Sequence, residues 1–247
     1  MKKNKIFYII FDNLKTLIGA LIIAIIIRSL IIQPFYIPSS SMEPTLLVGD
    51  RIFVTKYSYG YSKHSFPFSP NISNNRFFQS EPNQGDLVVF KTPVDNRTDY
   101  IKRLIGLPGD EIQFINGELL INGSKILRKK MNILEPIRCG DYTLDTNVYL
   151  ETLPNGTNHL VAYRKNGTLK NTQKYIVPAN HYFLMGDNRD CSKDSRFLND
   201  VGYVINLNLV GKAKMIFFSN DTQKSSLLKF WNLNETFRLN RTFKQLQ

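Results

Sequence analysis

The stretch EIQFINGELLI, residues 111–121, carries the clearest indication of the fold. Mainly apolar runs lie on both sides of Asn116-Gly117, and an Asn-Gly pair accepts the positive φ angles that a two-residue hairpin turn requires. Asn122-Gly123, a second pair of the same kind, follows at once. The stretch therefore predicts a β-hairpin that is followed by a second tight turn.

Similar short runs lie on both sides of this hairpin, and most are bounded by glycine, proline or polar residues. Short apolar runs between such residues are typical of strands. We expect a mainly β domain, built as several sheets or as a twisted barrel. The predicted strands lie within residues 47–55, 86–92, 100–105, 148–151, 159–164, 182–185 and 209–218.

Residues 16–32 differ from the rest because they are apolar on nearly every side. They read TLIGALIIAIII, then Arg28, then further apolar residues up to Ile32. A segment of roughly 17 residues is near the lower limit for crossing a bilayer, and a terminal arginine can extend its charge to the interface. We expect an uncleaved membrane anchor. The alternatives are a buried core helix and a cleavable signal peptide, although no small-x-small cleavage site follows the segment.

Residues 1–15 contain four lysines. Positive charge beside a first membrane span favours the cytoplasmic side. We therefore expect residues 1–15 to form a cytoplasmic N-terminus and the remainder of the chain to lie outside. The lysines of that remainder do not contradict this orientation, because long domains cross largely regardless of charge.

The net charge of +12 raises the question of nucleic acid binding. That function needs a basic helix or stripe, whereas the lysines and arginines here are mostly scattered. The charge is equally suited to a protein that works against an anionic membrane surface. We therefore expect a phospholipid membrane, and no nucleic acid, among the partners.

Cysteine and histidine are sparse. Cys139 and Cys191 are too few for a disulfide framework, and neither has metal-ligand spacing to another ligand. A single bridge between them in an oxidising compartment stays open. The three histidines, His64, His159 and His181, are isolated from one another, so we expect no metal site and no cofactor.

The serine run in PFYIPSSSMEPTL, residues 34–46, is the first candidate for chemistry. Pro38 and Pro44 fix the backbone on both sides of it. In an extended chain Ser39 and Ser41 point to one face, where one can act as nucleophile and the other as a donor to an oxyanion. The alternative is a linker between the anchor and the domain.

Lys102 is the second candidate, within YIKRLIGLPGD at residues 100–110. A lysine that faces a core is disfavoured, because burial removes solvent from its charge and lowers its pKa. Acting as a base near neutrality needs a fall of about 3 pKa units, roughly 4 kcal/mol. The alternative is an edge strand with Lys102 in water. The preceding stretch GDLVVFKTP, residues 85–93, indicates only a core strand.

The third candidate is GDNRDCSKDSR, residues 186–196, in which charged residues surround Ser192 and Ser195. It is interpreted either as a solvated turn or as a charge-linked loop that presents a hydroxyl to Lys102. Arg103 lies on the opposite face of its strand from Lys102 and can pair with one of the loop carboxylates.

Together and in this order, these segments resemble the boxes of bacterial type I signal peptidases, the leader peptidases with a Ser/Lys dyad. The matching patterns are PSxSMxPTL, GD-hydrophobic-FK, YIKRxxGLPGD and GDNRxxSxDSR, and the resemblance extends from the anchor to about Arg196. It implies a membrane-anchored serine endopeptidase without metal or cofactor. Such an enzyme removes signal peptides from secreted preproteins after small residues, of the Ala-x-Ala type, through an acyl-enzyme.

The resemblance also implies roles for individual residues. Ser41, the serine before methionine, is implied as nucleophile and Lys102 as general base. Ser39 is implied to assist the oxyanion hole, and Ser192 to hold the lysine. The substrate pockets are implied to include Phe35, Ile37, Met42, Leu46, Tyr100 and Ile101.

The implied fold is an all-β catalytic core, residues 33–111 and 178–247, with a smaller inserted β subdomain at 112–177. The implied location is the bacterial inner membrane, crossed once, with the catalytic domain on the periplasmic side. Two features depart from the family pattern. Cys191 stands where many members have asparagine, and one anchor is evident where some members have two.

Two other functions were weighed against this one. A self-cleaving repressor, another Ser/Lys protease, needs a DNA-binding helical domain where the anchor stands. A membrane-tethered β adaptor would use residues 39–41 only as a linker and would leave Lys102 with an ordinary pKa.

Two segments rich in aromatic residues have two possible interpretations each. Residues 57–78 are a loop that packs on the core or dips into lipid, and 227–246 form an interfacial amphipathic helix or a packed final helix.

Overall fold

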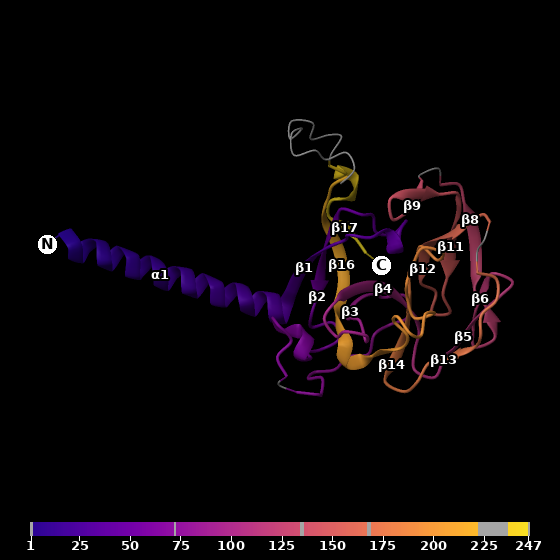
Figure 1. Ribbon diagram of the computed structural model, residues 1–247, viewed down its shortest axis with the longest axis horizontal. Helices are drawn as coiled ribbons and strands as arrows, with labels where there is room; N and C mark the ends of the chain where they lie inside the picture. Colours follow the sequence, from indigo (N-terminus) through magenta and orange to yellow (C-terminus); the bar gives the residue numbers. More distant parts are fainter. Residues whose placement is uncertain (1, 72, 134–135, 167–168, 222–236, 247) are drawn as a thin grey trace.

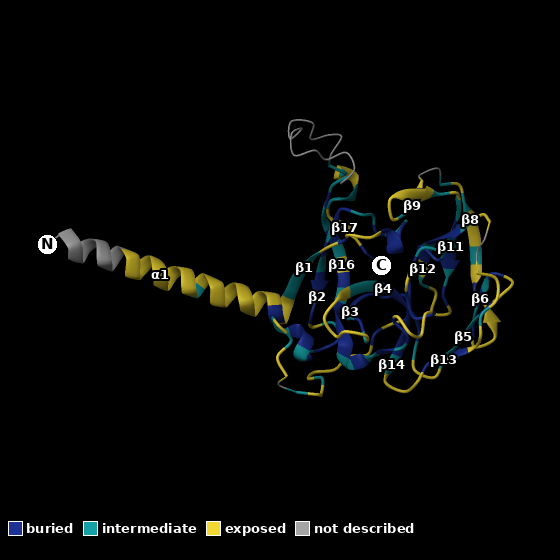
Figure 2. Ribbon diagram, viewed as in Figure 1, coloured by how far each residue is buried: buried dark blue, intermediate teal, exposed yellow. Residues whose placement is uncertain are grey.

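The computed structural model describes residues 2–71, 73–133, 136–166, 169–221 and 237–246. A long N-terminal helix stands apart from the rest of the chain (Figure 1). The helix α1 (Lys2–Ile26) continues as a short π-helix, η1 (Ile27–Ile31). By length and composition, Ile10–Ile31 is apolar enough to cross a membrane. Its side chains are almost all exposed (Figure 2), which excludes the alternative of a buried core helix.

The main sheet is antiparallel, with the order β1-β2-β16-β3-β4-β14-β15, and β17 pairs with β16 beside this path. A late strand, β16, therefore joins two pairs of early strands. The strands are β1 (Ile32–Tyr36), β2 (Asp50–Thr55), β3 (Leu87–Lys91), β4 (Asp99–Gly106), β14 (His181–Met185), β15 (Val204–Ile205), β16 (Leu209–Ser219) and β17 (Lys244–Gln245).

The residues between β4 and β14 form three smaller antiparallel sheets, with the orders β13-β5-β6-β7, β12-β11-β8 and β10-β9. Their strands are β5 (Glu111–Ile115), β6 (Glu118–Ile121), β7 (Ser124–Lys125), β8 (Leu127–Met131), β9 (Ile137–Cys139), β10 (Tyr142–Leu144), β11 (Thr146–Thr152), β12 (Asn158–Arg164) and β13 (Tyr175–Ile176). The division into a core and an inserted subdomain stays a prediction.

Four short 3-10 helices connect the strands. They are η2 (Ser40–Met42), η3 (Lys63–Ser65), η4 (Asn206–Asn208) and η5 (Leu239–Arg241). The packing is continuous across the smaller sheets and the main sheet, since one buried cluster unites Phe114 of β5 with Phe183 of β14.

Each predicted strand region contains a strand of the structure, and the Asn-Gly turns are confirmed by positive φ angles at Asn116, Gly117, Asn122 and Gly123. The mainly β fold is therefore confirmed. The strand β1 was not predicted. It contains Pro34 and lies at the edge of the main sheet, where the missing N–H of proline is tolerated.

Two expectations need correction. The serine run is not extended throughout, because the chain turns into η2 at Ser40. At the C-terminus, residues 222–236 lie outside the described part of the chain, and 237–246 contain η5 and β17 rather than a continuous α-helix.

Candidate active site

The side chains of Ser41 and Lys102 meet beside β4 of the main sheet. Ser41 lies in η2 after β1, and Lys102 lies in the middle of β4, opposite Val88 of β3. The Lys102 Nζ donates to the Ser41 Oγ at 2.6 Å. Ser41 is 9% exposed and Lys102 only 3%. A buried amine therefore contacts a serine hydroxyl across 61 residues of sequence.

Burial lowers the pKa of Lys102 to about 8, because the charged ammonium loses its solvation. The carboxylates of Asp194 and Asp187 act in the opposite direction, while Arg196 adds to the lowering. The ring of Tyr100 lies 5.4 Å from the Lys102 Nζ. The amine is thus able to lose its proton near neutral pH and to accept another.

The loop 186–196 fixes the backbone around Ser41. The Asn188 N–H donates to the Ser41 carbonyl at 3.1 Å, and its side-chain amide donates to the Ser40 carbonyl at 3.0 Å. The loop comes this close because residue 186 is glycine. A Cβ there would collide with Ser192 and with the Ser41 carbonyl oxygen.

Three buried ion pairs hold the loop in turn: Arg103 with Asp187, Arg189 with Glu151, and Arg196 with Asp194. Arg103 binds both carboxylate oxygens of Asp187, at 2.9 and 2.8 Å, and Thr45 donates to the same carboxylate at 2.6 Å. Although burial alone would raise the pKa of Asp187, the Arg103 guanidinium holds it below its ordinary value. Arg196 pairs with Asp194 at 2.8 Å. The expected pairing of Arg103 with a loop carboxylate is therefore present.

The two supporting serines differ in position. The Ser39 Oγ lies 3.4 Å from the Ser41 Oγ, on the same side of the site. Ser192 is buried against Gly186, and its hydroxyl helps to lower the pKa of the Asp194 carboxylate. The described contacts bring Ser39 to Ser41 but do not include a hydrogen bond from Ser192 to Lys102.

A cavity of about 380 Å³, which we call the substrate cavity, opens beside the dyad. Ser39, Ser41 and Lys102 line it, and the loop 186–196 contributes a wall. Of the pocket residues implied by the resemblance, Met42 and Leu46 are instead buried in the core cluster that includes Ile52 and Val54. The other four, Phe35, Ile37, Tyr100 and Ile101, line the cavity.

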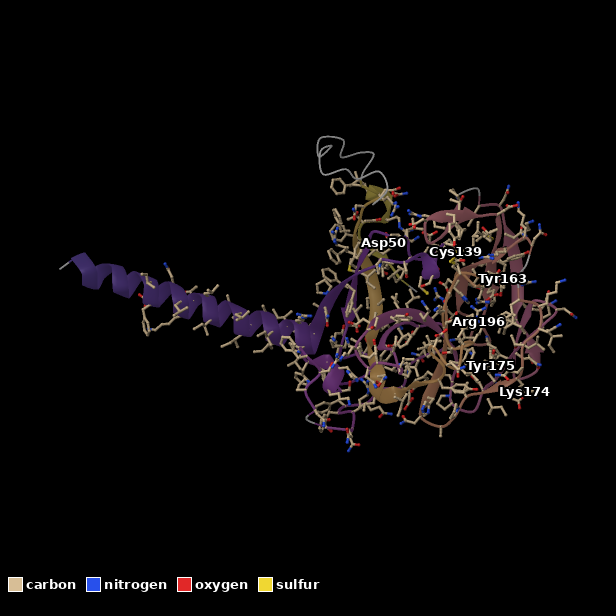
Figure 3. The ribbon with its side chains drawn as sticks, viewed as in Figure 1. Asp50, Cys139, Tyr163, Lys174, Tyr175 and Arg196 are labelled. Carbon is tan, nitrogen blue, oxygen red and sulfur yellow. A yellow bond between two sulfur atoms is a disulfide. The ribbon has the colours of Figure 1, made fainter. Side chains whose placement is uncertain are left out.

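Cys139 of β9 and Cys191 of the loop form a disulfide, with their Cα atoms 5.6 Å apart (Figure 3 labels Cys139). This answers the question that the sequence left open, and it also makes Cys191 unavailable as a free thiol. The bridge connects the inserted residues to a wall of the substrate cavity.

Sequence reasoning did not identify the residues that attach this β9 region to the serine run. The Glu43 carboxylate accepts the Arg138 backbone N–H at 2.7 Å, and the Gly140 N–H donates to the Ser40 Oγ at 3.2 Å. Nearly one hundred residues separate these partners in sequence, and no local pattern marks their pairing. The Asn188 contacts were missed for the same reason, although the loop itself was recognised.

Comparison with known proteins gives consistent matches. The family model described as "Signal peptidase, peptidase S26" matches residues 10–218. Signal peptidase I of Rickettsia akari (strain Hartford) is 42% identical over 248 residues, covering 91% of this chain and 88% of that protein. Signal peptidase I of Rickettsia bellii (strain OSU 85-389) is 39% identical, covering 94% and 84%. A crystal structure of a signal peptidase I from Enterococcus faecalis is 26% identical, with a TM-score of 0.32, covering 54% and 97%.

Proposed function

The chain belongs to the peptidase S26 family of signal peptidases, and we propose that it cleaves signal peptides through a dyad of Ser41 and Lys102. Family membership makes the chain a serine-type signal peptidase and excludes the adaptor without enzymatic activity. The observation that carries the choice of dyad is the 2.6 Å contact between a buried lysine amine and the hydroxyl of a buried serine.

In the proposed reaction, neutral Lys102 takes the proton of the Ser41 hydroxyl. The Ser41 Oγ then forms a bond to the carbonyl carbon of the scissile peptide, and the carbonyl electrons move onto its oxygen. When the C–N bond breaks, Lys102 returns the proton to the leaving amine. Lys102 then takes a proton from a water molecule, whose oxygen bonds to the ester carbonyl carbon. When the ester C–O bond breaks, Lys102 returns this proton to the Ser41 Oγ, which restores the serine hydroxyl and the neutral amine.

The negative charge on the tetrahedral oxygen needs donors that are in place before the reaction. The Ser41 backbone N–H and the Ser39 hydroxyl are proposed for this role. The 3.4 Å separation of the two hydroxyl oxygens supports it, since a group bound to the Ser41 Oγ lies within reach of Ser39. We propose that Ser192 shapes the space around Lys102, since it packs where the loop approaches Ser41.

Substrate selection is proposed to take place in the substrate cavity. Phe35, Ile37 and Ile101 give it apolar walls, which suit the small apolar side chains of an Ala-x-Ala cleavage sequence. Met42 and Leu46 are proposed to support these walls from the core.

The proposed setting is the bacterial inner membrane, crossed once by the apolar helix, with the N-terminus in the cytoplasm and the catalytic core outside. The lysines of residues 1–15 support this orientation. A preprotein held in the same bilayer meets the enzyme at a raised effective concentration. Residues 33–111 and 178–247 are proposed as the catalytic core and 112–177 as its insert, as the separate sheets suggest.

The test is covalent trapping of the nucleophile. We expect a serine-directed acylating inhibitor to add one acyl group to the full chain, and peptide mapping by mass spectrometry to place it on Ser41. The Ser41→Ala variant should not be labelled, whereas Lys129→Met, which changes an exposed lysine on β8, should be labelled as the native chain is. Labelling of another serine, or undiminished preprotein cleavage by Ser41→Ala, would exclude the dyad.

A further inference from the structure

A second cavity of about 320 Å³ lies where the membrane helix joins the main sheet. We call it the basic cavity, because five of its lining residues carry basic side chains. They come from five parts of the chain: the end of the helix, the residue after β2, the loop 57–78, the end of β3 and the β3–β4 connection. The five are Arg28, Lys56, His64, Lys91 and Arg97.

Lys56 is the most unusual member of this group. It is 1% exposed, and its backbone N–H donates to the Ile31 carbonyl at 3.1 Å, which places it at the base of the helix. Among the residues that the structure describes, no hydrogen bond or ion pair involves its amine. Burial, together with the charges of Arg28 and Lys91, lowers its pKa to about 8, while the Asp99 carboxylate acts in the opposite direction.

The carboxylate that lines this cavity does not form an ion pair with the buried Lys56 amine. Asp99 lines the cavity and attracts the Lys56 charge at a distance. Its Oδ1, however, already lies 2.9 Å from the Lys91 Nζ in an ion pair. The side chains of Arg28, Lys56 and Arg97 therefore leave the cavity with an excess of positive charge. A buried cation without a partner is costly, and a bound anion would remove that cost.

His64 provides a second, independent observation. It is 4% exposed, and its Nδ1 lies 3.0 Å from the Ser69 Oγ. Its other ring nitrogen, Nε2, is buried and has no hydrogen-bond partner. When Ser69 donates to Nδ1, the neutral ring carries its proton on Nε2. A residue that lines the cavity then has a buried N–H donor without a hydrogen-bond partner among the described residues.

The position of the cavity indicates the source of the anion. Arg28 lies near the end of the candidate span Ile10–Ile31, so the cavity faces the headgroup level of a membrane. The loop 57–78 is tied to the same place, because the Tyr61 hydroxyl donates to the Leu30 carbonyl at 2.9 Å. This loop presents a fully exposed Phe68 in the left-handed region. Exposed aromatic rings beside basic residues are typical of a membrane interface.

We propose that the basic cavity binds the phosphate group of an anionic membrane phospholipid, held by Lys56, Arg28, Arg97 and the Nε2–H of His64. Cations and an N–H donor around one oxyanion are the arrangement that binds phosphate most strongly. Phe35 and Asp99 line both the basic cavity and the substrate cavity. The lipid would therefore sit beside the place where a membrane-bound substrate enters.

Native mass spectrometry of the full chain in neutral detergent tests this proposal, with phosphatidylglycerol as the probe. We expect one phosphatidylglycerol to bind per chain, and we expect diacylglycerol, which lacks the phosphate, not to bind. Lys56→Met should weaken phosphatidylglycerol binding about 10-fold, as expected for the loss of one charge-assisted contact. Arg97→Gln, at an exposed position, should weaken it by several fold, and the matched Lys129→Met should not change it.

Folding of the variant is checked separately. Because Lys56→Met removes a buried charge that has no partner, its melting temperature without lipid should equal or exceed that of the native chain. Equal binding of phosphatidylglycerol by the native chain, Lys56→Met and Arg97→Gln would overturn the proposal. So would binding of glycerol 3-phosphate or inorganic phosphate as tight as that of the lipid, since the ligand would then be a free phosphate. None of these measurements depends on catalysis by the dyad.

Discussion

Lys56 and Lys102 are two buried lysines with similar burial and very different neighbours. Both are at most 3% exposed, and burial lowers the pKa of each to about 8. Lys102 contacts the Ser41 hydroxyl at 2.6 Å, whereas Lys56 lies among the charges of Asp99, Arg28 and Lys91. A lowered pKa therefore makes a lysine able to release its proton, but its partner decides what it does. One amine is placed to move a proton, and the other to attract an anion.

Removing each amine in turn is the strongest test of this comparison. Lys102→Met should lower kcat for a soluble signal-peptide substrate by about 10³-fold, because the general base is lost. Lys56→Met should lower it less than 10-fold in neutral detergent. The measurement is the steady-state rate of both variants with one fluorogenic peptide. A loss of more than 100-fold in Lys56→Met would show that Lys56 is also needed for catalysis. The proposed difference in role between the two lysines would then be wrong.

Asp187→Asn tests the comparison further, because it changes the charges around Lys102 and leaves those around Lys56 as they are. Arg103 would remain as a buried charge without its carboxylate, so the free energy of unfolding should fall by about 3–5 kcal/mol, measured by urea denaturation. The Asp187 charge also raises the pKa of Lys102. Its removal should therefore shift the pH–rate profile toward lower pH. A free energy of unfolding equal to that of the native chain would contradict the stabilising role of the Arg103–Asp187 ion pair.

Ser39→Ala probes the hydroxyl beside the contact between Lys102 and Ser41. Loss of an oxyanion donor should lower kcat by about 10²-fold with little change in KM, because the contact strengthens only in the transition state. The matched change Ser58→Ala, at a hydroxyl bound to Thr55 outside the dyad, should leave kcat near the native value. A change confined to KM would assign Ser39 to substrate binding instead.

The pH dependence distinguishes the two amines in the native chain. Only neutral Lys102 accepts the Ser41 proton, so kcat/KM should rise about tenfold per pH unit below pH 8 and level off above it. Lys56→Met should keep the same midpoint, since its amine takes no part in proton transfer. If the midpoint disappears in that variant, the titrating group is Lys56 and the comparison is wrong.

Much of the fold and of the candidate site can be predicted from local sequence, but not all of it. The hairpin at 111–121 and the strand around Lys102 follow from alternation and from turn residues that act over a few positions. Lys56, at the end of an ordinary strand, gives no such signal. Its burial is produced by the helix end and by the loop 57–78, which the chain brings together only after folding. The same applies to the pairing of Cys139 with Cys191, and to the burial of Met42 and Leu46 away from the cavity.

The place of β16 in the main sheet has a consequence for the order in which the enzyme becomes active. The strands β1 and β2 flank Ser41, and β3 and β4 carry Lys102, but β16 is the strand that joins the two pairs. Ribosomes release chains from the N-terminus, so residues 209–219 emerge long after both dyad residues. A growing chain therefore lacks the strand that joins the ribbon on either side of Ser41 to the ribbon that contains Lys102. We expect the proposed dyad to assemble only after β16 has been synthesised and has paired with β2 and β3.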